Sequence, residues 1–248
     1  MVSGRWSFAS GILHSSWVMG AFRMDSGGHR TLVFVIPKDQ AEVIDNWHVA
    51  GLQGTGSPDF SVDDVFVPEE QTYDLTAGAA RGGDLFRQEL HLFVSNEVPP
   101  VCAGLARRAL DDMTEMASHT ARFRGGSTLS ERAVFLKELG RAETKLRAAR
   151  LLHRDAVATA YDAARAGNGA AQGPRTAVAT ASVFAVETCA EVVTDLFRYG
   201  GGRVLMLSNP MQRHLRNALA ARQHLVVTEE HYEIAGRERI QSAKSRRD

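Results

Sequence analysis

Hydrophobic and polar residues alternate along the first third of the chain. Up to residue 76, short β-branched or aromatic runs are separated by clusters of Gly, Asp, Ser and Pro, which is typical of strands and turns. In the last run the alternation breaks at the Asp63–Asp64 step, which predicts one bulge or a change of face. Pro68 then ends the run. The expected strands are Arg5 to Ala9, His14 to Arg23, Thr31 to Ile36, Val43 to Val49 and Phe60 to Val67.

Beyond residue 84 the apolar spacing changes to the three-and-four pattern of helices. A Gly- and Ala-rich linker from Gly78 to Gly83 separates the two patterns. The segment from Pro174 to Phe197 is apolar nearly all round, so we expect it in the middle of a bundle or at a subunit contact. The four expected helices are Val101 to Thr120, Ser130 to Ala166, Pro174 to Phe197, and a last one that starts at Pro210 and continues through His224.

These elements predict an α+β fold with two domains. A small antiparallel β domain at residues 1–76 is followed by a four-helix bundle domain at residues 84–233. Residues 234–248 form a basic tail, which we expect to be a solvated terminus. The chain of 248 residues is long enough for both domains to have a core.

The last expected helix concentrates polar groups. Asn209 is a plausible N-cap and Pro210 suits the first helical position. A 3.6-residue period places Arg213, Asn217 and His224 on one stripe, where a guanidinium, an amide and an imidazole would share one space. An ordinary amphipathic surface helix is the alternative interpretation. The neighbouring stripe is apolar and consists of Met211, Leu215, Ala218 and Leu225.

Composition argues against several classes of protein. Lys plus Arg and Asp plus Glu both number 29, so no overall field recruits nucleic acid or an anionic membrane. Cys102 and Cys189 are too few for a disulfide framework or a zinc site, which fits a reducing cytoplasm. We expect no signal peptide and no membrane span. No GxGxxG or Walker sequence occurs, so we also expect no NAD(P)H site.

Three stretches, taken together and in this order, resemble a known family. They are WSFASGILHSSW from Trp6, GLQGTGSPDFSVDDVFVPEE from Gly51, and GGG…NPMQRHLRNALAARQH from Gly200. Over residues 2 to 232 the chain is similar to the acyl-CoA dehydrogenase fold. More narrowly, it resembles the flavin-dependent monooxygenases that use reduced flavin supplied by a separate flavin reductase. Members of that fold normally begin with an all-helical domain, and this chain opens where that domain should already be finished.

The resemblance implies a site for reduced FMN or FAD. Ser10 would offer its hydroxyl as a hydrogen-bond donor to the flavin ring and would be catalytic. Arg122 or Arg124 would bind a flavin phosphate, for which arginine is well suited. Each position also has an ordinary explanation as a turn, strand or helix-end residue. The cofactor-binding residues implied by the resemblance are Trp6, Phe8, Ser10, Thr55, Ser57, Arg122, Arg124, Gly200 and Gly201.

The resemblance also implies a substrate site, with His14 and Trp17 as its wall and Arg216 as an orienting group. His224 would be the catalytic base, because an imidazole with a pKa near 6.5 is suited to deprotonating a phenol-like hydroxyl. The dehydrogenase branch usually has a glutamate base, and its pattern places Leu225 at that position. Where the monooxygenase branch often has a histidine after GTGS, this chain has Pro58, which leaves that position without a polar side chain.

We therefore expect a monooxygenase that hydroxylates an aromatic or polyketide-like small molecule with reduced flavin and O2. The alternatives are an acyl-CoA dehydrogenase with a displaced base, and a noncatalytic or truncated scaffold of the same fold. Without the helical domain, a broad apolar surface would need cover. We expect a homo-oligomer, a tetramer or a dimer, or a separately encoded N-terminal helical domain as partner. Alone, the chain is expected to release hydrogen peroxide from reduced flavin.

Overall fold

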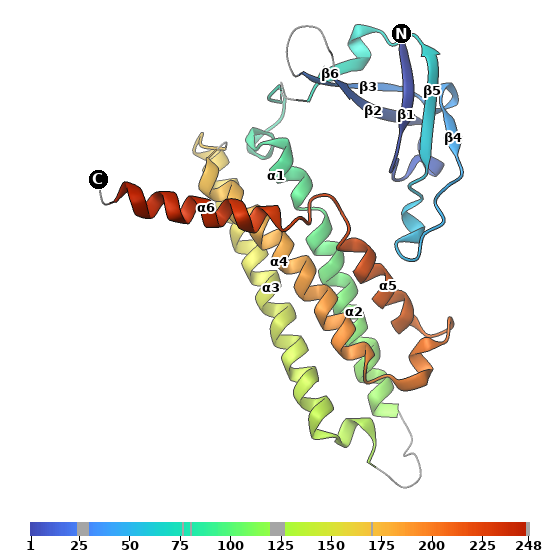
Figure 1. The fold of residues 1–248 in the computed structure, drawn as a ribbon, viewed down its shortest axis with the longest axis vertical. Helices are drawn as coiled ribbons and strands as arrows, with labels where there is room; N and C mark the ends of the chain where they lie inside the picture. Colours follow the sequence, from blue (N-terminus) through green and yellow to red (C-terminus); the bar gives the residue numbers. More distant parts are fainter. Residues whose placement is uncertain (24–29, 76, 80, 120–126, 170, 247–248) are drawn as a thin grey trace. The chain divides into compact units, whose positions relative to one another are not determined.

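A computed structural model describes residues 1–23, 30–75, 77–79, 81–119, 127–169 and 171–246 of the chain (Figure 1). The chain divides into two compact units, Met1–Ala80 and Arg81–Asp248. We call them the β unit and the helical unit and describe each by itself.

The β unit contains two antiparallel sheets of three strands each. All five predicted runs overlap a strand, although the bounds differ by several residues. The very short strand β6 was not predicted, because three residues carry too little pattern to recognise. The first sheet has the order β1 (Val2–Trp6), β5 (Asp59–Val65), β4 (Glu42–Ile44), and the second has the order β2 (Trp17–Arg23), β3 (Thr31–Pro37), β6 (Thr72–Asp74).

A bulge interrupts the pairing of β1 with β5. Val2 pairs with Val65 and Gly4 with Val62, so β5 carries one residue more than β1 between these pairs. Asp64 adopts a positive φ of 49°, and its backbone N–H donates to Ser3 Oγ at 2.8 Å. The structure thus confirms the bulge that the Asp63–Asp64 step predicts.

The core of the β unit lies around aromatic rings from different strands. The Trp6 ring stacks on Phe60 with 5.3 Å between centroids and meets Phe34 edge-on at 4.9 Å. Gly20 lies beneath both rings: a Cβ at this position would be 2.7 Å from Phe34 and 2.9 Å from Trp6. The fully buried residues of this core are Ile12, Val18, Phe34, Ile36, Phe60 and Val62.

The helical unit is a bundle organised around α4, which packs against α2, α3, α5 and α6. α4 is long and apolar enough to cross a membrane by length and composition, but 72% of its most apolar stretch is buried within the bundle. The prediction that this helix lies in the middle of a bundle is confirmed, as is the α+β fold class. The helices are α1 (Leu90–Ser95), α2 (Val98–His119), α3 (Ala133–Arg165), α4 (Gln172–Phe197), α5 (Pro210–Ala221) and α6 (Glu230–Ser245).

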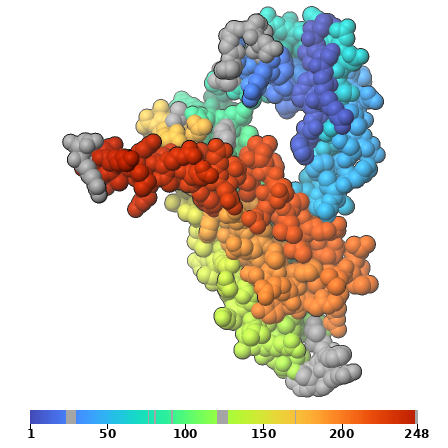
Figure 2. All heavy atoms as spheres, in the orientation of Figure 1, coloured from blue at the N-terminus to red at the C-terminus, as the bar shows by residue number. Residues whose placement is uncertain are grey.

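Helix α6 occupies the region that the sequence assigned largely to a solvated tail. None of its residues is buried, and Figure 2 shows most of α6, in red, standing out from the rest of the helical unit. It crosses α4 instead of running along it (Figure 1). Glu238 Oε1 accepts hydrogen bonds from Gln172 Nε2 at 2.7 Å and Thr176 Oγ1 at 2.8 Å, which tie α6 to α4.

Helix α5 is shorter than the sequence predicts. Asn209 caps it by accepting from Met211 N at 2.9 Å, as expected, but the helix ends at Ala221. Beyond that point His224 N bonds to Ala221 O in a turn, and Val226 becomes buried. The predicted stripe that placed His224 and Leu225 on a regular helix is therefore wrong. Burial of Val226 turns the chain inward, whereas Leu225 is 83% exposed.

Candidate functional site

Three predicted residues, Ser10, Thr55 and Ser57, are joined by hydrogen bonds in the β unit. The hydroxyls of Ser10 and Ser57 lie 2.8 Å apart, and Ser57 Oγ donates to Thr55 Oγ1 at 2.8 Å. Thr55 Oγ1 in turn donates to the carbonyl of Leu52 at 2.9 Å. We call Ser10, Ser57, Thr55 and the Leu52 carbonyl the hydroxyl relay. Its middle member, Ser57, is only 3% exposed, whereas Ser10 and Thr55 are exposed.

Backbone contacts hold the two ends of this relay together. Gly11 N donates to the carbonyls of Thr55 and Gly56 at 3.0 and 3.2 Å, and Ala9 N donates to Pro58 O at 3.1 Å. Gly11 and Gly56 both have positive φ, 82° and 50°, a conformation that glycine adopts without steric cost. Backbone hydrogen bonds thus join the segment around Ser10 and Gly11 to the segment Gly54 to Pro58.

Phe8, next to the relay, has an unusual conformation for an aromatic residue. Its φ is 62°, in the left-handed region that a bulky side chain rarely occupies. The ring is 74% exposed and meets the ring of Trp47 edge-on, at 6.2 Å between centroids. Strained backbone at an exposed aromatic side chain is a feature that clusters at ligand sites.

The other predicted residues of the β unit lie apart from this bonding. The Trp6 indole belongs to the core, and its Nε1 donates to the carbonyl of Ala21 at 2.9 Å. This packing explains Trp6 without a ligand. Trp17, on β2, and His14 are both exposed.

In the helical unit, His224 lies in the turn that follows α5. Its side chain is exposed, and its Nδ1 accepts from the backbone N–H of Val226 at 3.4 Å. A neutral imidazole that accepts at Nδ1 carries its proton on Nε2. Arg216 lies on α5 and is half-buried.

Glu187 on α4 contacts both sides of the His224 turn. Its Oε1 lies 3.4 Å from Arg222 Nη2, and its Oε2 accepts from Tyr232 Oη at 3.2 Å. Burial raises the pKa of the Tyr232 phenol, and the negative charge and hydrogen bond of Glu187 raise it further. The carboxylate therefore fixes the chain on either side of His224.

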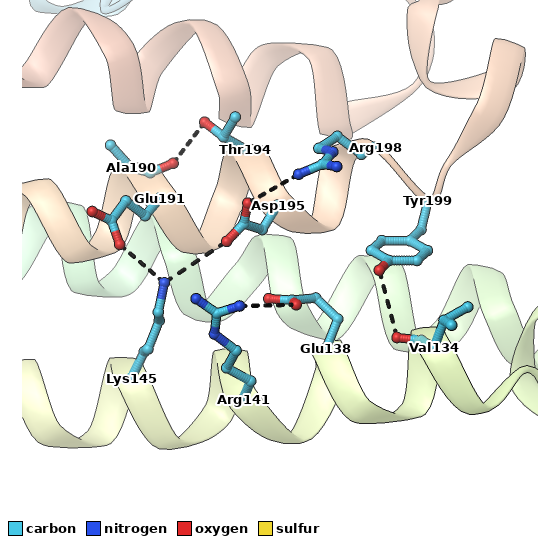
Figure 3. A network of polar contacts seen from close by, with 10 residues as sticks. All are labelled: Val134, Glu138, Arg141, Lys145, Ala190, Glu191, Thr194, Asp195, Arg198 and Tyr199. Carbon is cyan, nitrogen blue, oxygen red and sulfur yellow. Dashed lines mark hydrogen bonds and ion pairs between the residues drawn. The ribbon is translucent and has the colours of Figure 1, made fainter.

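The predicted glycines Gly200 and Gly201 follow a polar network at the end of α4 (Figure 3). Lys145 Nζ, from α3, lies 3.0 Å from Glu191 and 3.8 Å from Asp195, both on α4. Tyr199 Oη donates to the carbonyl of Val134 at 3.5 Å, so the chain is braced directly before Gly200.

Positions 200 and 201 favour glycine for different reasons. A side chain on Gly200 would collide with Val204, which is buried, whereas Gly201 has a positive φ of 61° and open space where a Cβ would stand. Packing alone requires glycine at position 200, and only Gly201 leaves room for a ligand to approach. Arg122 and Arg124, the predicted phosphate ligands, lie outside the described residues.

The sequence did not single out one buried polar pair in the helical unit. His214 Nε2 on α5 lies 2.7 Å from Asp112 Oδ2 on α2, and the side chains are 9% and 8% exposed. Arg108 pairs with the other oxygen of Asp112. A signal existed: His214 is three residues after Met211 and four before Ala218, both buried, and so lies on the buried stripe of α5.

A groove of about 670 Å³ between α2 and α3, with α4 as its floor, contains none of the predicted residues. Arg107 and Glu143 face each other across it through two contacts of 2.6 Å. Cys189 also lines it, but burial raises the pKa of its thiol to about 12 and that of Cys102 to about 11. Both thiols stay protonated at neutral pH, which argues against a nucleophilic role.

No group of three or more His, Cys, Asp or Glu side chains suited to a metal ion occurs in the part of the chain that the structure describes. The chemistry available to these residues is hydrogen bonding and proton transfer by hydroxyls and imidazole. These side chains supply no electrons themselves, so a redox reaction would need a bound cofactor.

Comparison with known proteins identifies the family. The family described as "Acyl-CoA dehydrogenase, C-terminal domain" matches residues 99–229, more than half of the chain. The chain belongs to this family, which confirms the resemblance found in the sequence.

Relatives and solved structures extend the similarity to the β unit. The chain is 28% identical over 237 residues to "Indole-3-acetate monooxygenase" of Pseudomonas putida, covering 95% of this chain and 61% of that protein. It is 31% identical over 245 residues to "FADH(2)-dependent resorcinol hydroxylase, oxygenase component" of Rhizobium sp. (strain MTP-10005), covering 90% and 60%. The crystal structure of 3-HSA hydroxylase from Rhodococcus sp. RHA1 superposes with a TM-score of 0.85 and 25% identity, covering 96% and 64%. The chain thus spans about three fifths of the length of the curated relatives it matches.

Proposed function

We propose that this chain acts in the oxygenase component of a two-component flavin-dependent monooxygenase. Its substrate would be an aromatic or polyketide-like small molecule, hydroxylated with O2 and reduced FMN or FAD from a separate flavin reductase. The observation that carries the proposal is the hydroxyl relay, which ends at exposed Ser10 beside the exposed ring of Phe8. The names of the relatives, an indole-3-acetate monooxygenase and an FADH(2)-dependent resorcinol hydroxylase, support the same reaction class.

The residues around the relay fit a flavin ring, which is flat, apolar on its faces and polar along one edge. Phe8 and Leu13 offer exposed apolar surface, and Leu13 lies against Gly56. Gly54 has open space where a side chain would otherwise stand. Ser10 supplies the polar contact. This combination of apolar walls and a few placed polar groups is typical of cofactor sites.

When bound, reduced flavin would supply two electrons to activate O2. The balance is substrate C–H plus O2 plus reduced flavin giving substrate C–OH, water and oxidised flavin. The chain's own residues would bind, orient and exchange protons. Ser10, with Thr55 and Ser57 behind it, would hold the cofactor's polar edge, and Phe8 would exclude water from one side of it.

His224 is the group we propose to act on the substrate hydroxyl. Its Nδ1 accepts from Val226 N, so in the neutral ring Nε2 carries a hydrogen that can stabilise a developing phenolate oxygen. As a base, the ring would take the proton on Nδ1 and give up that bond. Arg216 would orient the substrate, with His14 and Trp17 as further wall residues.

The remaining partners follow from the proposed class. Arg122 or Arg124 would bind the flavin phosphate, and Gly201, with Gly200 behind it, would contact the remainder of the cofactor. The apolar run Leu205, Met206 and Leu207 is exposed, which supports assembly into a homo-oligomer, either a dimer or a tetramer, or cover by a helical domain. We place the protein in the cytoplasm.

An acyl-CoA dehydrogenase is the rival candidate, favoured by the family match alone. It needs a carboxylate base, and Leu225 stands at the expected position. Among the nearby acids, Glu230 lies in the first turn of α6, outside the His224 turn. A noncatalytic scaffold remains the second alternative.

An anaerobic flavin titration followed by exposure to O2 tests the proposal. Binding of reduced flavin, and then a hydroxylated product from resorcinol or indole-3-acetate, supports it. Bleaching of bound FAD by an acyl-CoA indicates the dehydrogenase, and binding of neither flavin state indicates a scaffold. The oligomer follows from light scattering of the same samples, and hydrogen peroxide released per hydroxylated product measures how well the pocket closes.

A further inference from the structure

The hydrogens of the hydroxyl relay run in one direction. The Leu52 carbonyl can only accept a hydrogen bond, so the Thr55 hydroxyl donates its single hydrogen to this carbonyl. Ser57 then donates to Thr55 at 2.8 Å and has no hydrogen left for Ser10. The 2.8 Å contact between Ser10 and Ser57 can therefore form only if Ser10 donates.

The lone pairs of the Ser10 hydroxyl oxygen consequently point outward, away from Ser57. Its hydrogen points toward buried Ser57, while the side chain itself is exposed. The end of the relay is thus an acceptor, which recognises an N–H or O–H donor and repels another acceptor. The sequence alone suggested the opposite role, a Ser10 hydroxyl that donates.

We infer that Ser57 and Thr55 are positioning residues which make Ser10 an acceptor, and that this polarity lets the site select reduced over oxidised flavin. The inference rests on the proposed function. Ring nitrogen N5 of a reduced flavin carries a hydrogen, whereas N5 of the oxidised ring is a bare acceptor. With N5 placed against Ser10, as the proposal requires, Ser10 would accept from the reduced ring but would meet the oxidised ring lone pair to lone pair.

The relay resists simple rotation of Ser10. For Ser10 to donate outward, the buried Ser57 oxygen would lose the hydrogen bond that it accepts, which is unfavourable for a buried polar atom. We therefore expect the selection between the two flavin states to be on the order of tenfold or more.

Thr55 offers a matched pair of variants, because it is exposed and its replacement should not unfold the β unit. Thr55→Val keeps the shape but removes the hydroxyl, so Ser57 is free to donate to Ser10 and Ser10 to donate outward. Thr55→Ser keeps the relay. Ser57→Ala frees Ser10 directly, and Ser61→Ala, on β5 but outside the relay, controls for general disturbance of the unit.

The experiment measures dissociation constants for FMN and FAD, oxidised in air and reduced under anaerobic conditions, for the 248-residue chain and each variant. We expect the ratio of oxidised to reduced dissociation constants to fall about tenfold in Thr55→Val and Ser57→Ala, mainly through tighter binding of oxidised flavin, and to persist in Thr55→Ser and Ser61→Ala. An unchanged ratio in Thr55→Val and Ser57→Ala, or an equal weakening of both redox states, would overturn the inference while leaving the proposed function intact. A wild-type chain that binds neither flavin would overturn the proposed function, and the inference with it.

Discussion

His214 Nε2 lies 2.7 Å from Asp112 Oδ2, and this contact joins α5 to α2 inside the helical unit. The two residues are 102 positions apart, and both side chains are at least nine-tenths buried. The exposed side chain of Arg108 pairs with the second carboxylate oxygen of Asp112. Helix α5 ends just before the turn that carries His224, so this pair anchors the element from which the candidate catalytic histidine emerges.

Asp112→Ala should destabilise the helical unit by about 3 kcal/mol, because removal of one partner leaves a buried polar group uncompensated. Urea unfolding followed by circular dichroism measures the change. Asp111→Ala is the matched control. Asp111 is exposed, and its ion pair with Arg107 is long, at 3.8 Å, so loss of the carboxylate should cost less than about 1 kcal/mol of stability. Equal effects of the two variants would show that the buried pair does not stabilise the bundle.

His224→Ala should lower the rate of hydroxylation on the order of 100-fold, because it removes the group proposed to act on the substrate hydroxyl. Folding and flavin affinity should hardly change, since the side chain is exposed and its contact with Val226 N, at 3.4 Å, is long. Single-turnover kinetics with preformed reduced flavin isolates the step. Leu225→Glu is the companion variant, and it should not create dehydrogenase activity with an acyl-CoA. Normal hydroxylation by His224→Ala would leave this histidine without a catalytic role.

The stability of the helical unit should fall as pH rises above about 9. Burial raises the pKa of Cys102 to about 11 and of Cys189 to about 12, from 9.0. Between pH 9.0 and the raised pKa of each thiol, the unfolded chain has lost the proton that the folded chain keeps. The free energy of unfolding therefore falls with increasing pH, on the order of 1 kcal/mol per pH unit for each thiol. Urea unfolding between pH 8 and 11 measures the slope. Cys189→Ala should reduce it, and an unchanged slope in that variant would assign the loss to other groups.

Gly20→Ala should destabilise the β unit by roughly 1–3 kcal/mol, because the added methyl would overlap the rings of Phe34 and Trp6 in a packed core. Thermal unfolding of the two variants Gly20→Ala and Gly54→Ala makes a matched comparison. Gly54 has nothing within 4 Å of its missing Cβ, so its substitution should be nearly neutral for stability. A neutral Gly20→Ala would mean that the two rings can move apart without cost.

Much of the fold could be predicted from local pattern alone. The apolar spacing over α2, α3 and α4 is long and regular, and the Asp63–Asp64 step marks the bulge in β5. The end of α5 could not be found this way. No Gly or Pro lies between Ala221 and the start of α6 at Glu230, and the helix stops because Val226 is buried, which depends on tertiary packing.

The residues of the candidate site could be predicted from the sequence, but the hydrogen bonds between them could not. Ser10, Thr55 and Ser57 were each chosen from short motifs, yet the contact between Ser10 and Ser57 spans 47 positions, and its direction depends on the Leu52 carbonyl. His214 was missed because a histidine on an apolar stripe needs its partner, Asp112, before it stands out.

Glu187 should control the position of His224. Its carboxylate contacts Arg222 at 3.4 Å and Tyr232 at 3.2 Å, on either side of the turn. Glu187→Ala removes both contacts, and we expect the hydroxylation rate to fall about tenfold because the imidazole is no longer held in place. The flavin dissociation constants should stay unchanged.

Glu187→Gln separates charge from geometry. The amide oxygen can still accept from Tyr232, so hydroxylation should remain close to that of the wild type. The pKa of Tyr232 should fall but stay above 10, because burial is its largest cause and the charge of Glu187 comes next. Absorbance titration of tyrosinate, with Tyr232→Phe to assign the signal, measures this shift. If Glu187→Ala hydroxylates at the full rate while the Tyr232 pKa falls, the carboxylate tunes the phenol but does not position His224.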